Sequence, residues 1–211
     1  RSSAASDVYK RQVYEARDGT VWAGTLTAGV SRVTGGRLTT YTMANGLISN
    51  TVNSMIEGPD GAMWFATPVG LSVLSQDRWQ SYTKSQGLPS DEANCLLLDS
   101  GGVLWVGTAA GLAYRGSSGF KAPGGAYGSL IEPVLGMAED RFGWLWVATT
   151  NHVLRVNRAK LHQGALGEGD VREYGLADGL RGVEGVKRDR SVVEDSSGRI
   201  WFSLNRAIAV V

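Results

Sequence analysis

The sequence predicts an all-β fold built from about five repeated four-stranded antiparallel sheets, of which the first and the last are incomplete. Glycine supplies 29 of 211 residues and charged residues only 19%, a composition that favours short strands and turns over long helices. A pattern centred on tryptophan returns about every 41 residues. This period is typical of a β-propeller, in which each repeat forms one blade around a central axis.

Each copy of the pattern is anchored by a tryptophan with a glycine three residues before it. The tryptophans are 42, 41, 41 and 55 residues apart, and an acidic residue stands six or seven positions before each of them. We expect the tryptophans to form the core between neighbouring blades and the glycines to form turns. These structural repeat residues are Trp22, Trp64, Trp105, Trp146 and Trp201, with Gly19, Gly61, Gly102, Gly143 and Gly198.

The second copy shows how one blade is built. Residues 52–57 form a short run of strand-favouring side chains, and Asp60-Gly61 supplies a hairpin signal into a second strand at 62–67. Further turns lead into strands at 71–74 and 78–82. In the first predicted strand of the third blade, Cys95 aligns with Ser54, Gly136 and Ser191. We therefore expect Cys95 to be a small packed residue near the axis.

The ends of the chain depart from the repeat. Residues 1–12 (RSSAASDVYKRQ) share nothing with the rest of the sequence. They resemble a translated sequencing adapter, and a polar linker is the alternative. We assign 1–12 as a non-native or linker segment and 13–211 as the partial propeller. The first blade then lacks most of its opening strand, and the last ends before its fourth strand.

Composition excludes several functional classes. A formal charge of +1 gives no electrostatic footprint for nucleic acid or for a membrane surface. The single cysteine excludes an internal disulfide and a multi-cysteine metal site, and His152 and His162 are not spaced as a helical zinc motif. No apolar run is long enough to span a membrane. The sequence predicts no catalytic residue, no metal and no cofactor.

Residues 193–203 (VEDSSGRIWFS) and 98–112 (LDSGGVLWVGTAAGL) resemble the two-component-regulator propeller repeat. The register excludes the sialidase-type aspartate box, and WD repeats are excluded because no Trp-Asp pair occurs. The resemblance implies a fragment of a seven-bladed propeller in the periplasmic, extracytoplasmic part of a bacterial inner-membrane histidine kinase. It also implies a downstream sandwich domain, a membrane helix and a kinase, so the fragment itself is expected to have no enzymatic activity.

Candidate site residues are those that break the repeat on one face of the propeller. The connection between the second and third strands of a blade lies on the same face as the crossover to the next blade. On that face, Asn151 and His152, and later Asn205 and Arg206, replace the glycine pattern of earlier copies. Their side chains suit a sugar or a carboxylate ligand. The alternative is that they are solvated loop residues.

Two further segments depart from the repeat. An insertion at 157–170 is expected to form one helical turn at 158–163. We interpret it as a surface excursion, with a lid or a partner contact as alternatives. A modestly basic stretch at 181–190 is interpreted as a solvated crossover, with an anion site as the alternative.

Ligand sensing is the leading functional hypothesis, with a small molecule or a glycan as the ligand. An alternative is a streptogramin-lyase-type enzyme with a histidine acid or base and a divalent metal. Only His152 lies on the relevant face, and no carboxylate stands near it in the sequence. A protein-docking scaffold is a third possibility. The expected partners are the ligand, the remaining blades and the sandwich domain, with a homodimer in the parent and no direct membrane contact.

Overall fold

A computed structural model describes residues 10–123, 128–188 and 190–211. It consists of five antiparallel sheets, each a meander in which consecutive strands are neighbours, and we number these sheets blade 1 to blade 5. Blade 1 contains β1 (Lys10–Glu15), β2 (Val21–Thr25), β3 (Val30–Thr34) and β4 (Arg37–Tyr41). Blade 2 contains β5 (Ser54–Glu57), β6 (Met63–Thr67), β7 (Gly70–Ser75) and β8 (Arg78–Tyr82).

Blades 3 to 5 continue the pattern. Blade 3 contains β9 (Ala93–Leu98), β10 (Leu104–Thr108), β11 (Gly111–Gly116) and β12 (Gly119–Lys121). Blade 4 contains β13 (Val134–Glu139), β14 (Trp144–Thr149), β15 (Val153–Asn157) and β16 (Val171–Tyr174), with α1 (Arg158–Gln163) before β16. Blade 5 contains β17 (Val192–Glu194), β18 (Ile200–Ser203) and β19 (Ile208–Val210). Short 3-10 turns are η1 (Met43–Asn45), η2 (Lys84–Gln86), η3 (Gly128–Leu130) and η4 (Leu176–Asp178).

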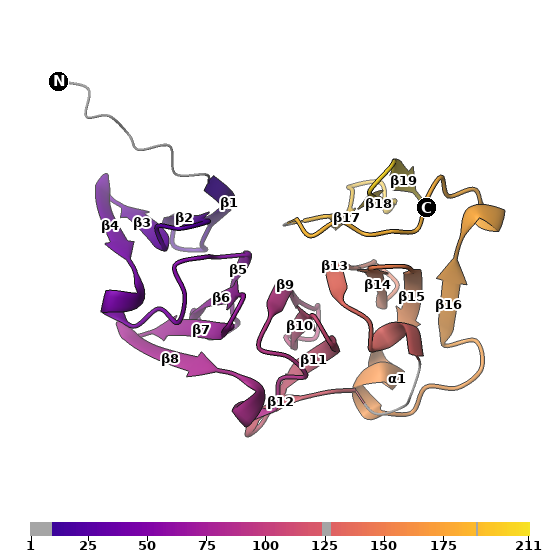
Figure 1. Ribbon diagram of the computed structural model, residues 1–211, viewed down its shortest axis with the longest axis horizontal. Helices are drawn as coiled ribbons and strands as arrows, with labels where there is room; N and C mark the ends of the chain where they lie inside the picture. Colours follow the sequence, from indigo (N-terminus) through magenta and orange to yellow (C-terminus); the bar gives the residue numbers. More distant parts are fainter. Residues whose placement is uncertain (1–9, 124–127, 189) are drawn as a thin grey trace.

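The five blades form an open arc (Figure 1). Their first strands lie on the inside of the arc, where β5 contacts β1 and β9, and β13 contacts β9 and β17. The arc is open between blade 1 and blade 5 (Figure 1). The predicted all-β partial propeller is therefore confirmed, and the last blade has three strands.

The start of the first blade differs from the prediction. Strand β1 begins at Lys10, so blade 1 has four strands and starts three residues before the expected boundary at residue 13. Gln12 belongs to the segment assigned as non-native or linker. It is 7% exposed and donates a hydrogen bond from Nε2 to the carbonyl of Met55 in blade 2. The foreign origin of residues 1–12 stays a prediction, and residues 1–9 lie outside the described residues.

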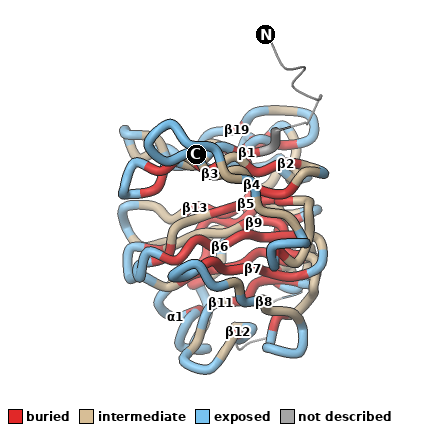
Figure 2. The backbone as a smooth tube through the Cα atoms, turned by 90° about the vertical axis from the view of Figure 1, so that its left-hand side faces the viewer, coloured by how far each residue is buried: buried red, intermediate tan, exposed pale blue. Residues whose placement is uncertain are grey.

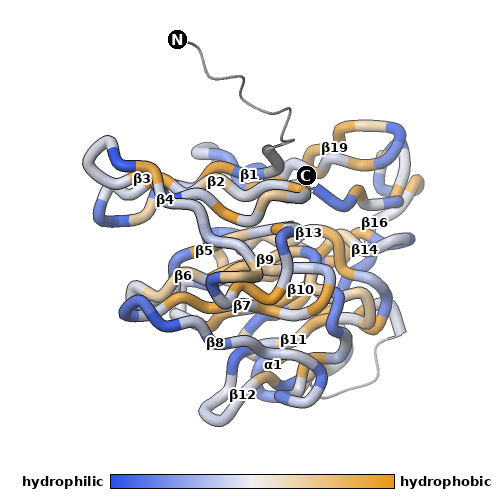
Figure 3. Tube along the Cα trace, turned by 60° about the vertical axis from the view of Figure 1, so that its left-hand side comes forward, coloured by the Kyte–Doolittle hydropathy of each residue, from blue (hydrophilic) through white to orange (hydrophobic). Residues whose placement is uncertain are grey.

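Aromatic side chains pack between neighbouring blades. Trp64 contacts Tyr82 of its own blade in a tilted arrangement and Phe120 of blade 3 edge to face, at centroid distances of 5.5 and 5.9 Å. Trp146 contacts Tyr174 and Phe202 in the same way. Buried residues follow the strands in Figure 2, and hydrophilic residues gather at the turns in Figure 3. The repeated tryptophans Trp22, Trp64, Trp105 and Trp146 are at most 4% exposed, whereas Trp201 in the last blade is half-buried.

The five repeated glycines share one backbone conformation. Gly19, Gly61, Gly102, Gly143 and Gly198 all have a left-handed φ, between 78° and 81°. Each lies in the turn between the first and second strands of its blade, where a side chain would be strained. The glycine spacing in the sequence therefore reports the turn geometry directly.

The insertion after β15 is largely exposed, in line with a surface excursion, but one of its side chains joins the core. Helix α1 forms at the predicted residues, but Leu161 is only 1% exposed and packs in the cluster around Trp105. The His162 ring lies 4.6 Å from the Tyr114 ring. Strand β12 has three residues, and its Phe120 packs on Trp64 of blade 2. Helix α1 of blade 4 therefore packs on Trp105 of blade 3.

Candidate functional site

The two ends of the blades have different chemistry. We call the end with the second-to-third-strand connections and the crossovers the loop face, and the end with the first-to-second-strand turns the turn face. On the loop face, Ala109 N donates to Glu92 O at 2.9 Å and Asn205 N donates to Glu184 O at 2.9 Å. The crossovers therefore lie beside the second-to-third-strand loops, as expected for propeller blades.

A threonine at the end of each second strand organises the regular loops. Thr67 and Thr108 donate from Oγ1 to the carbonyls of Gly70 and Gly111, both at 2.7 Å. In blade 4 the glycine is replaced by His152. Thr149 Oγ1 keeps a longer bond of 3.3 Å to the His152 carbonyl and also bonds to Glu132 Oε2 at 2.9 Å. The loop of blade 4 therefore uses the same threonine to position a carboxylate.

His152 lies between two carboxylates. Its Nδ1 is 3.0 Å from Glu132 Oε2, and its Nε2 is 3.5 Å from Glu173 Oε1. Partial burial acts to raise the pKa of Glu132, but hydrogen bonds from His152 and Thr149 outweigh burial and lower the pKa. An Asn151 side-chain hydrogen bond adds to this lowering. Glu132 is therefore held ionised as part of a polar cluster with Asn151 and His152.

Asn205 and Arg206 belong to a different arrangement. They line a pocket of about 300 Å³ together with Arg181, Val183 and Glu184, and with Leu176 and Gly182 at its rim. Asn205 Nδ2 donates to Glu184 Oε2 at 2.9 Å. Arg206 is exposed, and it has no hydrogen bond or ion pair with another residue of the described chain. Asn151 and His152 are not among the lining residues, so the four predicted site residues fall into two neighbouring groups.

Sequence reasoning missed the partners of both groups. It found no carboxylate near His152, and the structure corrects this because Glu132 precedes β13 and Glu173 lies in β16. The register that pairs Val153 with Tyr174 brings Glu173 next to the His152 loop. Neither residue is close to His152 along the chain, so only a known strand register could have predicted the cluster.

Arg181 was assigned to a solvated crossover, and one length signal could have singled it out. Leu180 is 21 residues before Trp201, whereas Leu47 and Leu88 are each 17 residues before their tryptophans. The crossover into blade 5 is therefore four residues longer than its counterparts. Within this longer crossover, Lys187 Nζ forms an ion pair with Glu92 of the crossover into blade 3. The segment therefore has a fixed contact with another blade and is not wholly solvated.

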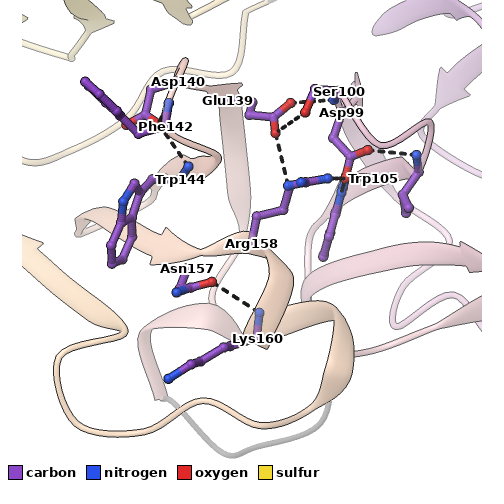
Figure 4. Close-up of polar contacts among 11 residues, drawn as sticks. Asp99, Ser100, Trp105, Glu139, Asp140, Phe142, Trp144, Asn157, Arg158 and Lys160 are labelled. Carbon is purple, nitrogen blue, oxygen red and sulfur yellow. Dashed lines mark hydrogen bonds and ion pairs between the residues drawn. The ribbon is translucent and has the colours of Figure 1, made fainter.

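The turn face holds an internally paired network around Asp99 (Figure 4). Asp99 Oδ2 accepts from Trp105 Nε1 at 2.8 Å and forms an ion pair with Arg158 Nη1 at 2.7 Å. Arg158 Nε lies 3.0 Å from Glu139 Oε1, and Glu139 accepts from Ser100 Oγ at 2.8 Å. Burial acts to raise the pKa of Asp99, but the hydrogen bonds from Trp105 and Arg158 outweigh it and lower the pKa. These charges stabilise the packing of blade 3 against blade 4 and leave no open binding group.

Two kinds of feature are absent from the described residues, side-chain groups that could hold a metal ion and helices that could span a membrane. Across 10–123, 128–188 and 190–211, no three His, Cys, Asp or Glu side chains are arranged to hold a metal ion. The described helices include none of the length and hydropathy needed to cross a membrane.

Comparison with known proteins identifies the repeat. Residues 46–68 and 87–110 match the family model described as two component regulator propeller. The comparison with curated proteins finds no match. In structure, the chain is similar to the extracellular domain assigned to the hybrid two component system BT3049 of B. thetaiotaomicron, with a TM-score of 0.79 and 19% identity over 96% of this chain and 27% of that one.

Two other solved structures are also similar. One is virginiamycin B lyase from Staphylococcus aureus, with a TM-score of 0.67 and 17% identity over 99% of this chain and 71% of that one. The other is PorZ, a surface component of the type-IX secretion system of Porphyromonas gingivalis, with a TM-score of 0.71 and 11% identity over 99% of this chain and 33% of that one. The chain spans about a quarter to a third of the length of the two-component-system domains that it matches. The matched repeats confirm the predicted resemblance, and the structural likenesses confirm the propeller fold.

Proposed function

We propose that this chain, two of whose repeats match the two-component-regulator propeller model, is part of the ligand-sensing domain of a membrane-bound sensor histidine kinase. The observation that carries the proposal is the match of two repeats to that family model. In the parent protein the propeller lies on the extracytoplasmic side, and the kinase domain is carried elsewhere in the chain. The ligand is a carbohydrate or another small molecule that binds on the loop face of blades 4 and 5.

The geometry of the loop face supports binding more than catalysis. In blades 1 to 3 the second-strand threonines Thr25, Thr67 and Thr108 bond to loop carbonyls. In blade 4 Thr149 keeps a longer bond to the loop carbonyl of His152 and also bonds to Glu132, which joins His152 in a polar cluster. Blade 5 presents Arg206 to solvent. Hydrogen-bonding groups of several types on one open face suit recognition of a polar ligand.

A lyase is the second candidate, because virginiamycin B lyase shares the fold and because His152 has carboxylate partners. In that case His152 would act as the acid or base, oriented by Glu132. The test is turnover of a streptogramin such as quinupristin by the full chain, with and without EDTA. Turnover that EDTA abolishes would favour the lyase, and absence of turnover would remove this candidate.

Sensing is tested on the parent protein expressed from its native gene, with a panel of neutral and acidic oligosaccharides. We expect one member to bind by calorimetry and to change kinase autophosphorylation. The double variant His152→Ala/Arg206→Ala should weaken that binding while the thermal melting temperature stays unchanged. Unaltered affinity in the double variant would remove both residues from the site. A parent gene that encodes no membrane span and no kinase would contradict the sensor.

A further inference from the structure

We propose that the pocket between the crossover into blade 5 and the β18–β19 loop binds an organic carboxylate, recognised by the guanidinium groups of Arg181 and Arg206. This inference rests on the proposed function and names the ligand class of the same face. Both arginines line the pocket of about 300 Å³ described above, together with Val183, Glu184 and Asn205.

The two arginines differ from three paired arginines on the turn face. There, Arg158 is paired with Asp99 at 2.7 Å, and Arg199 is paired with Asp195 at 2.7 Å. Arg17 is likewise paired with Glu57, at 3.1 Å. Within the described part of the chain, Arg181 and Arg206 have no hydrogen bond or ion pair, although they line one pocket. Two free guanidinium groups in one pocket provide planar donors that match a carboxylate.

The backbone around the pocket is held in place by hydrogen bonds. Asn205 N donates to Glu184 O at 2.9 Å, and Gly185 N donates to Thr149 O at 3.0 Å. Gly185 also forms a β-bridge with Leu204. The crossover is therefore tied to the loops of both blade 4 and blade 5. Because the backbone is anchored, the positions from which Arg181 and Arg206 project are set before a ligand binds.

The other residues that line the pocket indicate the charge, the apolar surface and the size of the ligand. Glu184 is the pocket's one carboxylate, and Asn205 Nδ2 holds its Oε2 at 2.9 Å. Two arginines and one glutamate leave a formal charge of +1, which favours an anion. Val183 packs against the core and Leu176 is 71% exposed, so both offer apolar surface to a ring. The volume is at the small end for ligand pockets, which suits an acid of one or two rings.

The experiment measures binding of digalacturonate and of its neutral methyl ester to the full chain by isothermal titration calorimetry. We expect the acid to bind about tenfold more tightly than the ester, because only the acid forms charge-assisted hydrogen bonds with the arginines. Arg181→Gln and Arg206→Gln should each weaken binding of the acid by about tenfold. Arg181 and Arg206 are both exposed, so the melting temperature of each variant should not change.

Arg78→Gln is the matched control, since Arg78 is an exposed arginine at the start of β8 with no ion pair among the described residues. It should bind the acid with unchanged affinity. N-acetylneuraminate and benzoate extend the panel of carboxylates. Equal binding of acid and ester, or unchanged affinity in both arginine variants, would overturn the proposal. So would the failure of all three acids to bind at about 10 mM, a concentration that reveals even weak complexes.

The outcomes separate this inference from the sensor proposal. If neutral oligosaccharides bind the loop face and carboxylates do not, the carboxylate pocket is wrong and sensing stands. If carboxylates bind through Arg181 and Arg206 but leave the parent's kinase activity unchanged, the pocket is correct and sensing is wrong.

Discussion

The turn face and the loop face of the same blades use charged residues in opposite ways. On the turn face, a glutamate at the end of the first strand accepts a hydrogen bond from the backbone of the preceding blade. Glu57 accepts from Arg17 N at 2.8 Å, and Glu194 accepts from Arg141 N at 3.1 Å. On the loop face of blades 4 and 5, His152, Asn205 and Arg206 appear once each and follow no such rule.

The comparison shows that residues which recur in every blade and residues which break the repeat have different physical origins. Every blade must bind its neighbour in the same way, so a residue that joins blades recurs with the period of the repeat. A small ligand needs one site, and the residues that bind it interrupt the repeat. The acidic residues that recur before the tryptophans are therefore structural. We assign ligand recognition to the residues that interrupt the repeat.

The largest effect should follow from breaking the turn-face network at Asp99. Asp99→Ala removes the acceptor of Trp105 Nε1 and leaves Arg158 without its closest partner. We expect a loss of about 3–5 kcal/mol in the free energy of unfolding, since one member of a buried ion pair is removed. Urea denaturation measures it. A loss below about 1 kcal/mol, the range of surface pairs, would show that the network is not structural.

Acidification should weaken the same face by a smaller amount. Folding lowers the pKa of Asp99, against the effect of burial, and hydrogen bonds from Trp201 and the Arg199 backbone lower the pKa of Asp195. The unfolded chain then binds more protons, so this stabilisation is present above the ordinary aspartate pKa of about 3.9 and is lost as the pH falls below it. Melting temperatures between neutral and acidic pH measure the loss. Asp99→Asn should flatten the dependence, and an equally steep profile in that variant would exclude Asp99 as a source.

Blade 2 offers a way to extend the network instead of breaking it. Gly58 occupies the position of Asp99 and Asp140, and Trp64 Nε1 is buried without an acceptor. A Cβ at position 58 would lie 2.8 Å from Asp60 Oδ1 and 3.1 Å from Trp64 Nε1, so these side chains must shift in any variant with a side chain here. Gly58→Asn supplies an amide oxygen and should therefore be more stable than Gly58→Ala by about 1 kcal/mol, the usual net value of one hydrogen bond. Gly58→Ala is the control, because it adds the same Cβ without an acceptor. Equal stability of the two variants would contradict the expected bond to Trp64.

The smallest effect is expected on the loop face. His152→Ala removes contacts with Glu132 and Glu173, but the histidine side chain is 26% exposed and the ion pairs lie at the surface. We expect the free energy of unfolding to change by less than about 1 kcal/mol. Urea denaturation beside Asp99→Ala measures the contrast. A loss as large as that of Asp99→Ala would make the His152 cluster structural and weaken its assignment to recognition.

Blade number, turn positions and the helical turn at 158–163 were all readable from the chain alone. These features depend on local chemistry. A glycine such as Gly61 indicates a left-handed turn, and a short run of strand-favouring side chains between turn signals indicates a strand of four to six residues. The repeat adds the information that each blade packs on the next through one tryptophan, because a single blade cannot bury its own apolar face.

The candidate site required the tertiary structure. Glu132 contacts His152 from the crossover into blade 4, 20 residues earlier in the chain. Arg181 lies in the longer crossover into blade 5 and lines one pocket with Arg206. Leu161 of helix α1 packs in the cluster around Trp105 of the preceding blade. Each of these contacts is made by a loop or crossover of irregular length that packs against residues distant in the sequence. A repeat pattern carries no record of such contacts, since they occur once and outside its period.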